Sequence, residues 1–399
     1  MTAQASYKAH FSRFLEAAPQ RLHFAAHSHH YWPDVTFDAQ VACWQDAARL
    51  ADGKWAHVFA EVMPAVQRGI ARHLGLDDAA SLAFAPNTHE FLRRLLSCFP
   101  ADRPVRILTS DGEFHSFTRQ AARLEEDGLV AVTRVPVEPF ADFTRRFTAA
   151  AEAAPHDLIF VSQVFFNSGF ALADLDGLVR RLMDAEAYIV IDGYHGFLAR
   201  PTDLGGIARR VFYLAGGYKY AMSGEGACFL HAPAGFGLRP RDTGWYAAFG
   251  ALQRESGEQG GSGGVAYGPD AARFLGATFD PVGLYRLRAV LGLLEELGLD
   301  AAAIHAHARG LQRRFLAGLR ARPAAELPLE RLLLDPQRQP CGNFLTFDLD
   351  SEAAAAAAHA RLKAAEISTD FRGSRLRLGF GLYQDPEDVD ALLDRLAAL

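Results

Sequence analysis

Short apolar runs rich in Val, Ile, Leu and Phe alternate with longer amphipathic stretches between Val105 and His231. Strand patterns that alternate with helical ones predict strand–helix–strand units around a mainly parallel sheet. The predicted strands are Val105–Thr109, Leu129–Val135, Leu158–Ser162, Tyr188–Asp192, Val211–Ala215 and Ala227–His231. Several end in polar or glycine residues, and ligands of open α/β sheets bind beyond the carboxyl ends of the strands. We therefore expect the functional site at that edge.

Helical patterns flank this block on both sides. Upstream, the predicted helices are Val35–Leu50, Glu61–Leu74 and one that opens at Pro86–Glu90 and runs to Phe99, with Asn87 or Thr88 as its N-cap. Downstream, helices at Val282–Leu297, Ala301–Leu319, Ala353–Ala365 and Pro386–Leu396 accompany short strands at Phe344–Asp348 and Arg375–Gly379. The sequence thus predicts a second, smaller α+β unit after the alternating block.

The length of 399 residues leaves room for two or three units. We predict an α/β fold in three parts. An N-terminal segment, residues 1–34, packs at the crevice; residues 35–281 form a large domain whose mainly parallel sheet has helices on both faces; residues 282–399 form a small C-terminal α+β domain. Within the second part, Gly257 to Gly264 (GEQGGSGG) is predicted to be a mobile surface loop or lid.

Charge and cysteine usage exclude several classes of protein. A net charge of −6 without a basic stripe argues against nucleic acid as a partner. The start, Met1 to Glu16, lacks the apolar core of a secretory signal, so we expect a cytoplasmic protein without a membrane partner. The cysteines lack the paired spacing of a zinc site or a disulfide framework, and we expect reduced thiols at Cys43, Cys98, Cys228 and Cys341.

Two residues at predicted strand ends suggest a chemistry. Asp192 ends one buried strand, and Lys219 follows another within Gly216–Tyr220. A carboxylate in a dry site can keep a pyridine nitrogen protonated, and a nearby lysine can form an imine with an aldehyde. Together they indicate a site for a pyridine aldehyde.

The segment from Tyr188 to Leu230, YIVIDGYHGFLARPTDLGGIARRVFYLAGGYKYAMSGEGACFL, resembles the class V aminotransferase family of fold-type I pyridoxal-phosphate enzymes. That family includes aminotransferases, kynureninases and cysteine desulfurases, and further motifs extend the resemblance over most of the chain. It implies pyridoxal 5′-phosphate as cofactor, held as a Schiff base on Lys219. It also implies that Asp192 pairs with the pyridine nitrogen, that His195 reaches the ring oxygen, and that Tyr218 contacts the phosphate.

Three other motifs resemble cofactor-binding parts of this family. Pro86-Asn87-Thr88-His89 resembles the turn into a helix whose N–H groups hold the phosphate, which implies roles for Thr88 and His89. Asp111–Ser116 resembles the motif that supplies the ring stacked on the cofactor, with Phe114 as in kynureninases and His115 as the alternative. Phe274–Thr278 resembles the family's Gly-x-Thr segment, which reaches the cofactor phosphate of the other subunit across a dimer interface. This implies a role for Thr278 and a homodimer with the active site at the interface.

Substrate recognition is implied by two segments. Asp370–Gly379, followed by Tyr383–Asp388, resembles the family's carboxylate-binding arginine strand. Arg377 takes that role, since a planar guanidinium grips a carboxylate with two parallel hydrogen bonds. The N-terminal segment resembles the part that enters the substrate pocket, so His29, or its neighbour His27, is expected to contact substrate.

The resulting function is a pyridoxal-phosphate enzyme for a small amino acid, with transamination as the main hypothesis. The close alternative is a kynureninase-like Cβ–Cγ hydrolase. A cysteine desulfurase ranks last because the loop before Arg377 lacks a cysteine, and the last cysteine, Cys341, lies at a predicted strand entry. Gly216 replaces the serine that many relatives carry three residues before the lysine, which weakens the implied phosphate grip. A non-catalytic cofactor-binding relative is also considered. A metal hydrolase built on His27-Ser28-His29-His30 is remote because no carboxylate ligand is evident, and no metal is predicted.

Overall fold

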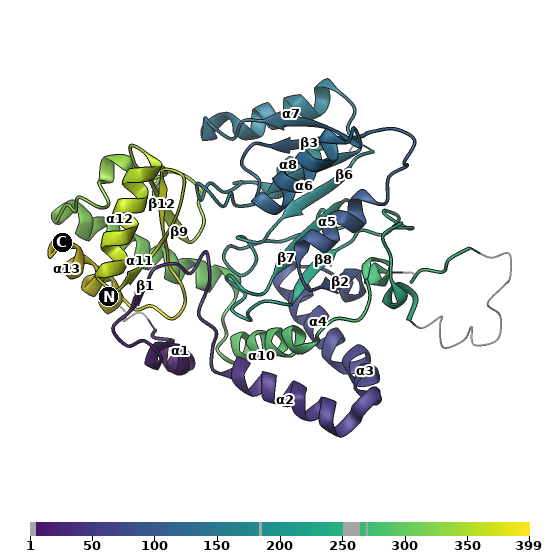
Figure 1. Cartoon of the computed structure of the whole chain (residues 1–399), viewed down its shortest axis with the longest axis horizontal. Coiled ribbons are helices and arrows are strands. Elements are labelled where there is room, and N and C mark those ends of the chain that lie inside the picture. The colour runs from purple at the N-terminus through teal and green to yellow at the C-terminus, as the bar shows by residue number, and fades with distance from the viewer. Residues whose placement is uncertain (1–4, 183–185, 250–263, 269) are drawn as a thin grey trace.

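The computed structural model describes residues 5–182, 186–249, 264–268 and 270–399. The predicted loop at Gly257 to Gly264 lies, apart from its last residue, outside the described residues. Within them the chain forms a large α/β domain and a smaller C-terminal α+β domain side by side (Figure 1).

A seven-stranded sheet forms the centre of the large domain, in the order β2-β8-β7-β6-β5-β3-β4. Its strands are β2 (Leu82–Ala85), β3 (Val105–Ser110), β4 (Val130–Val135), β5 (Leu158–Ser162), β6 (Tyr188–Asp192), β7 (Val211–Gly216) and β8 (Cys228–His231). Strands β4, β3, β5, β6 and β7 pair in parallel, which confirms the predicted sheet type. Strand β8 runs antiparallel to both β7 and β2, and β2 was not predicted.

The central strands are uninterrupted apolar runs because helices cover both faces of the sheet. All residues of β5 and β7 are buried. The helices of this domain are α2 (Val35–Leu50), α3 (Lys54–His57), α4 (Met63–Leu74), α5 (Thr88–Leu96), α6 (His115–Glu126), α7 (Phe143–Ala153), α8 (Leu175–Leu182) and α10 (Val282–Glu296). Helix α10 runs alongside α2 and α4 in Figure 1. The predicted division of the chain at residues 281 and 282 stays a prediction.

The C-terminal domain has a three-stranded antiparallel sheet in the order β11-β12-β9. Its elements are α11 (Ala301–Ala321), β9 (Phe344–Asp348), α12 (Glu352–Ala364), β10 (Ile367–Ser368), β11 (Asp370–Arg372), β12 (Arg375–Gly379) and α13 (Pro386–Ala397). Helix α13 begins with a capping box of Asp385 and Asp388 and with Pro386 at its first turn, the signals expected at a helix start.

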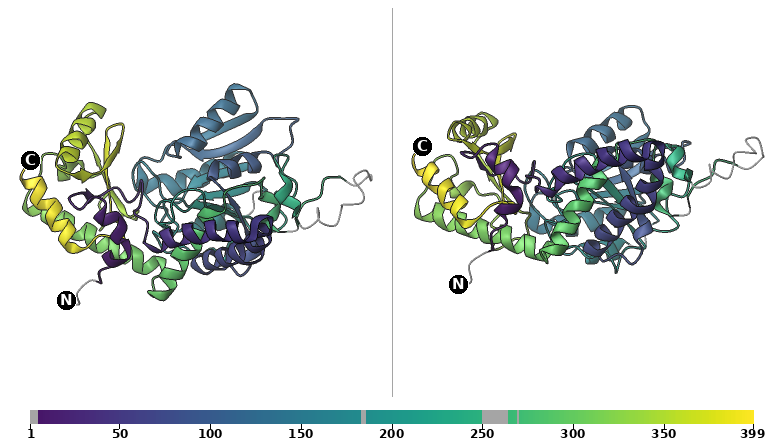
Figure 2. Two further views of the ribbon diagram at one scale, coloured as in Figure 1. Left: turned by 60° about the horizontal axis from the view of Figure 1, so that its bottom comes forward. Right: turned by 90° about the horizontal axis from the view of Figure 1, so that it is seen from below.

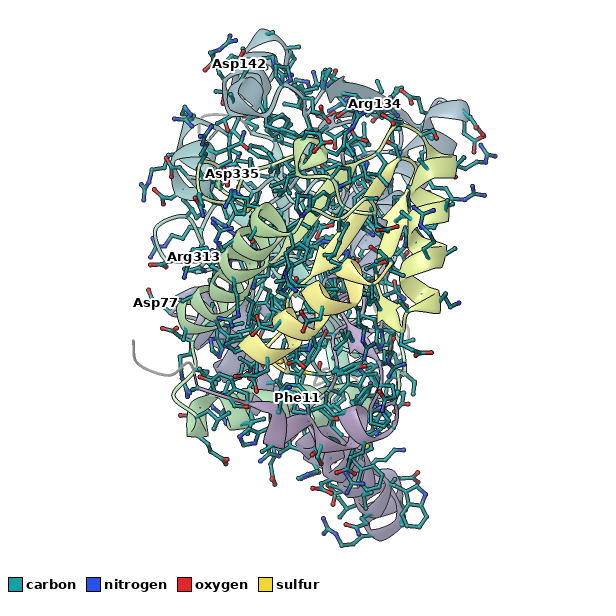
Figure 3. All side chains as sticks on the ribbon, turned by 90° about the vertical axis from the view of Figure 1, so that its left-hand side faces the viewer. Phe11, Asp77, Arg134, Asp142, Arg313 and Asp335 are labelled. Carbon is teal, nitrogen blue, oxygen red and sulfur yellow. The ribbon has the colours of Figure 1, made fainter. Side chains whose placement is uncertain are left out.

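The N-terminal segment packs on the C-terminal domain before the chain enters α2 (Figure 2). After α1 (Ser12–Glu16), strand β1 (Leu22–His23) pairs in parallel with β10. Phe11 packs against Tyr383 and lies beside the C-terminal elements in Figure 3. This pairing places the turn that follows β1 against the small domain, where His27 contacts Asp370. No helix in the described part of the chain is long and apolar enough to cross a membrane.

Candidate active site

A cavity of about 360 Å³ lies at the carboxyl ends of β5, β6 and β7, the edge predicted from the sequence. It is lined by Asn87, Thr88, His89, Phe114, Ser116, Ser162, Phe166, Asp192, Tyr194, His195, Tyr218 and Lys219. A larger hollow of about 650 Å³ lies at the opposite end of the sheet, where Arg103 and Arg106 are both paired with Asp157. Because those charges already satisfy one another, we place the chemistry in the first cavity.

Lys219 stands in the turn after β7 with its amine inside the cavity. Its Nζ lies 2.8 Å from His195 Nε2, and its side chain is buried, unlike those of the other three lysines. Burial lowers the pKa of Lys219 to about 7, although the nearby Asp192 carboxylate opposes the shift. Burial also holds the pKa of His195 well below its ordinary value. A substantial fraction of Lys219 is therefore a neutral nucleophile near pH 7.

This lowered pKa predicts the pH dependence of reactions with aldehydes. Only the neutral amine attacks a carbonyl, so the rate for Lys219 should rise about tenfold per pH unit below pH 7 and level off above it. For an ordinary exposed lysine, with a pKa of about 10.4, the reaction rate would continue to rise with pH above pH 7. Stopped-flow absorbance with an aromatic aldehyde between about pH 5 and 9 measures the profile. A rate still rising tenfold per unit at the upper end would contradict the shift.

Asp192 ends β6, and its half-buried carboxylate has no ion-pair partner among the described side chains, although the charge of Lys219 acts on it. Its Oδ1 accepts the N–H of Tyr194 at 2.9 Å, and none of the ion pairs between described side chains includes it. Burial raises the pKa of this carboxyl. A protonated pyridine nitrogen would supply the missing cation, so this observation fits the cofactor that the sequence implied.

Glu113 is a buried acid behind the cavity, and sequence reasoning missed it. Its carboxylate accepts hydrogen bonds from Ser110 Oγ and Ser162 Oγ, both at 2.5 Å. Burial raises the pKa of Glu113 to about 8 against these hydrogen bonds. The sequence did offer a signal for Glu113, because this acid directly precedes Phe114 and follows shortly after the apolar strand β3.

The N-terminus of α5 forms one end of the cavity. Asn87 is its N-cap, because the Asn87 side chain accepts the N–H of Glu90 at 3.0 Å. Thr88 and His89 open the helix at the cavity wall, where the first amides and the helix dipole favour an anion. The sequence expectation for these residues as phosphate ligands agrees with this position.

Aromatic rings surround the amine of Lys219. The Phe114 ring centroid is 5.2 Å from Nζ, and Phe166 meets Phe114 edge-on at 5.3 Å. His115 contacts both of these rings but is not among the residues lining the cavity. Of the two candidates for the stacking ring, the geometry therefore favours Phe114. Tyr218 lines the cavity with its ring centroid 5.6 Å from Nζ.

Arg377 lies on β12, outside the cavity lining but next to Phe166. Its Nε and Nη2 donate to the two Asp370 oxygens at 2.9 and 2.5 Å, and its Nη1 donates to the Phe166 carbonyl. Three of the five guanidinium N–H groups are thus used, which leaves one on each Nη nitrogen for a carboxylate. Arg372 is exposed and only approaches Asp370 at 3.9 Å, and Arg375 pairs with the exposed Glu138, which favours Arg377.

The histidine cluster does not converge on one point. His27 is buried and its Nε2 bonds Asp370 at 2.8 Å, whereas His29 is exposed and faces Glu225 at 3.6 Å. His30 bonds the carbonyl of Tyr31. His27 rather than His29 therefore belongs to the Arg377 assembly. Among the described residues no group of three or more His, Cys, Asp or Glu side chains could hold a metal ion.

Asp370 joins Arg377 and His27 and should stabilise the small domain. Burial would raise the pKa of Asp370, yet its contacts with His27 and Arg377 hold it well below its ordinary value. Asp370→Ala leaves a buried guanidinium unpaired, and we expect a loss of about 3–5 kcal/mol in the free energy of unfolding by urea titration. Asp390→Ala removes an exposed pair with Arg314 and should cost less than about 1 kcal/mol. Equal losses in both variants would contradict this account.

Thr278 and the cysteines lie away from the cavity. Thr278 is exposed and its Oγ1 accepts the Trp245 indole N–H at 3.2 Å, so its role across a subunit interface stays a prediction. Cys341 contacts Arg309 Nη1 at 3.1 Å, and Cys228 lies behind Tyr194. None of the four cysteines is among the lining residues.

The sequence matches no family model and no curated protein. Solved structures do resemble the fold. A lysine-to-alanine mutant of C-DES, with glycine covalently linked to its pyridoxal-phosphate cofactor, is 17% identical with a TM-score of 0.80, and the match covers 98% of this chain and 99% of that one. The complex of the cystine C–S lyase C-DES with cysteine persulfide is 17% identical with a TM-score of 0.78, covering 96% and 99%.

An apo cysteine desulfurase from Thermococcus onnurineus is 16% identical with a TM-score of 0.77, and the match covers 100% of this chain and 99% of that one. The chain therefore has the fold of these class V, fold-type I enzymes, and the predicted fold class is confirmed.

Proposed function

We propose that this chain is a pyridoxal-phosphate enzyme that acts on a small amino acid through Lys219, with transamination as its reaction. One observation carries the proposal: a buried lysine amine, 2.8 Å from His195, shares a cavity with a helix N-terminus and with the unpaired carboxylate of Asp192. The lysine amine can react with an aldehyde, the helix N-terminus can bind an anion, and the Asp192 carboxylate can accept a hydrogen bond from a protonated pyridine nitrogen. The likeness in fold to C-DES, whose structure carries the same cofactor, supports it.

The residues of the site have different proposed roles. Thr88, His89 and Tyr218 would hold the phosphate, Phe114 would pack on the ring, His195 would reach its oxygen, and Asp192 would keep the pyridine nitrogen protonated. When bound, the cofactor supplies an electron sink for the pair left on Cα. Lys219 Nζ would accept the Cα proton, because burial leaves a substantial fraction of this amine neutral near pH 7. Arg377 orients the substrate carboxylate with its two remaining N–H groups.

The second candidate is a kynureninase-like cleavage between Cβ and Cγ. The aromatic wall of Phe114 and Phe166 favours it, because such a wall suits an aryl side chain. Sulfur transfer through an enzyme thiol has less support, since none of the cysteines lines the cavity.

The test is to titrate purified protein with the cofactor, record the visible spectrum, and add amino acids singly. The panel contains alanine, glutamate, aspartate, kynurenine, cysteine and cystine. Formation of a 2-oxo acid that needs an added 2-oxo acid acceptor indicates transamination. Anthranilate with alanine indicates Cβ–Cγ hydrolysis, and pyruvate with reduced sulfur indicates C–S cleavage. Protein that develops no visible band and shows no spectral response to any amino acid would overturn the proposal.

A further inference from the structure

The hydroxyl of Tyr194 occupies the space that a side chain at position 216 would fill. A Cβ atom placed on Gly216 would lie 2.2 Å from Tyr194 Oη and 2.4 Å from Cys228 Sγ. Any residue other than glycine would therefore collide with this hydroxyl. The two positions face each other from neighbouring parallel strands, because Tyr194 follows β6 and Gly216 ends β7.

The same hydroxyl is close to the anion-binding end of the cavity. Its hydrogen-bond partner is Cys228 Sγ at 3.4 Å, a weak sulfur contact, and that thiol also interacts with the backbone N–H of Thr88. Thr88 is the first residue of α5. Tyr194 lines the cavity together with Thr88, His89 and Tyr218. Burial raises the pKa of Tyr194 well above its ordinary value, so the group remains an O–H donor at neutral pH.

We propose that Tyr194 Oη is a ligand of the cofactor's phosphate, which it reaches from the β6 side while Gly216 leaves the space open. The inference rests on the proposed function. The O–H exchanges a weak sulfur contact for a charged oxygen acceptor, and such charge-assisted hydrogen bonds are among the stronger ones in proteins. The bare Gly216, which lacks the hydroxyl a serine would offer, is thereby compensated by Tyr194.

The experiment compares two forms of the cofactor. Apo-protein and its Tyr194→Phe variant are titrated with pyridoxal phosphate and with pyridoxal, which lacks the phosphate, and dissociation constants are measured by absorbance. We expect roughly 10- to 100-fold weaker binding of pyridoxal phosphate by the variant, the usual worth of a hydrogen bond to a charged group. Binding of pyridoxal should stay the same. Tyr213→Phe is the matched control, because its buried hydroxyl donates to Gln163 outside the cavity lining.

A second substitution that restores binding distinguishes a hydrogen bond to the phosphate from a general effect on packing. Tyr194→Ala should weaken binding of pyridoxal phosphate. Adding Gly216→Ser together with Cys228→Ala, which removes the thiol 2.4 Å from the new Cβ, should recover most of it, since the serine hydroxyl then occupies the vacated space. Gly216→Ser alone collides with Tyr194 and should not improve binding.

Two results would overturn the inference and leave the proposed function standing. One is unchanged affinity of Tyr194→Phe for pyridoxal phosphate; the other is an equal loss for both cofactor forms. Wild-type protein that binds neither form would overturn the proposed function and this inference with it.

Discussion

Lys219→Ala is expected to lower kcat/KM by at least about 10³-fold, because the variant loses both the anchor for the aldehyde and the group that moves the Cα proton. Lys219 is the only lysine whose side chain is buried, and its Nζ contacts His195 within the cavity. The variant should therefore also lose the visible band of lysine-bound cofactor. Steady-state kinetics and absorbance spectra measure both effects.

Borohydride reduction followed by peptide mapping sharpens this test. Reduction locks the cofactor onto whichever lysine holds it, and the chain offers four lysines. In the wild type the label should appear on the peptide with Lys219. Lys363→Ala, which removes an exposed lysine on α12, should leave the label and the activity unchanged. A labelled Lys54 or Lys363 in place of Lys219 would refute the assignment.

Asp192→Asn is expected to lower turnover by about 10²- to 10³-fold while the visible band of lysine-bound cofactor, which Lys219→Ala loses, remains. The amide keeps the acceptor oxygen that receives the Tyr194 N–H. It carries no negative charge, so it cannot hold a pyridine nitrogen protonated, and the electron sink weakens. Exchange of the substrate Cα proton with deuterium, followed by NMR, measures the step that should slow.

Asp174→Asn provides the matched control for this substitution. Asp174 is exposed and accepts the N–H of Gly177 at the start of α8, a bond that asparagine also makes. Its turnover should equal that of the wild type. If the turnover of Asp192→Asn stayed within about threefold of the wild type, the proposed role of this carboxylate would be wrong.

The parts of the site that follow strand ends could be predicted from the sequence. Apolar runs mark buried strands, and parallel strands bring their carboxyl ends to one edge, so Ser162, Asp192 and Lys219 had to meet. The helix start at Asn87 was likewise readable, because capping depends on residues within one turn. The choice of Phe114 over His115 was left open, since both are aromatic and adjacent.

The direction of strand β8, near one end of the sheet, could not be predicted from the sequence. Strand β8 is as fully buried as its neighbours, yet it pairs antiparallel with β7 and β2. Burial on both faces gives the same pattern in either direction. The four-residue run of β2 was too short to be distinguished from other apolar stretches.

What the sequence by itself determined is the fold class and the edge of the sheet that carries the site, where Asp192 and Lys219 both line the cavity. These depend on periodicity and on order along the chain. The tertiary structure alone decided that His27 rather than His29 holds Asp370 beside Arg377, and that Tyr194 fills the space over Gly216. Both are side-chain contacts between separate elements, and the first joins residues more than 300 positions apart. Their geometry depends on how strands and domains pack, which no local pattern of residues encodes.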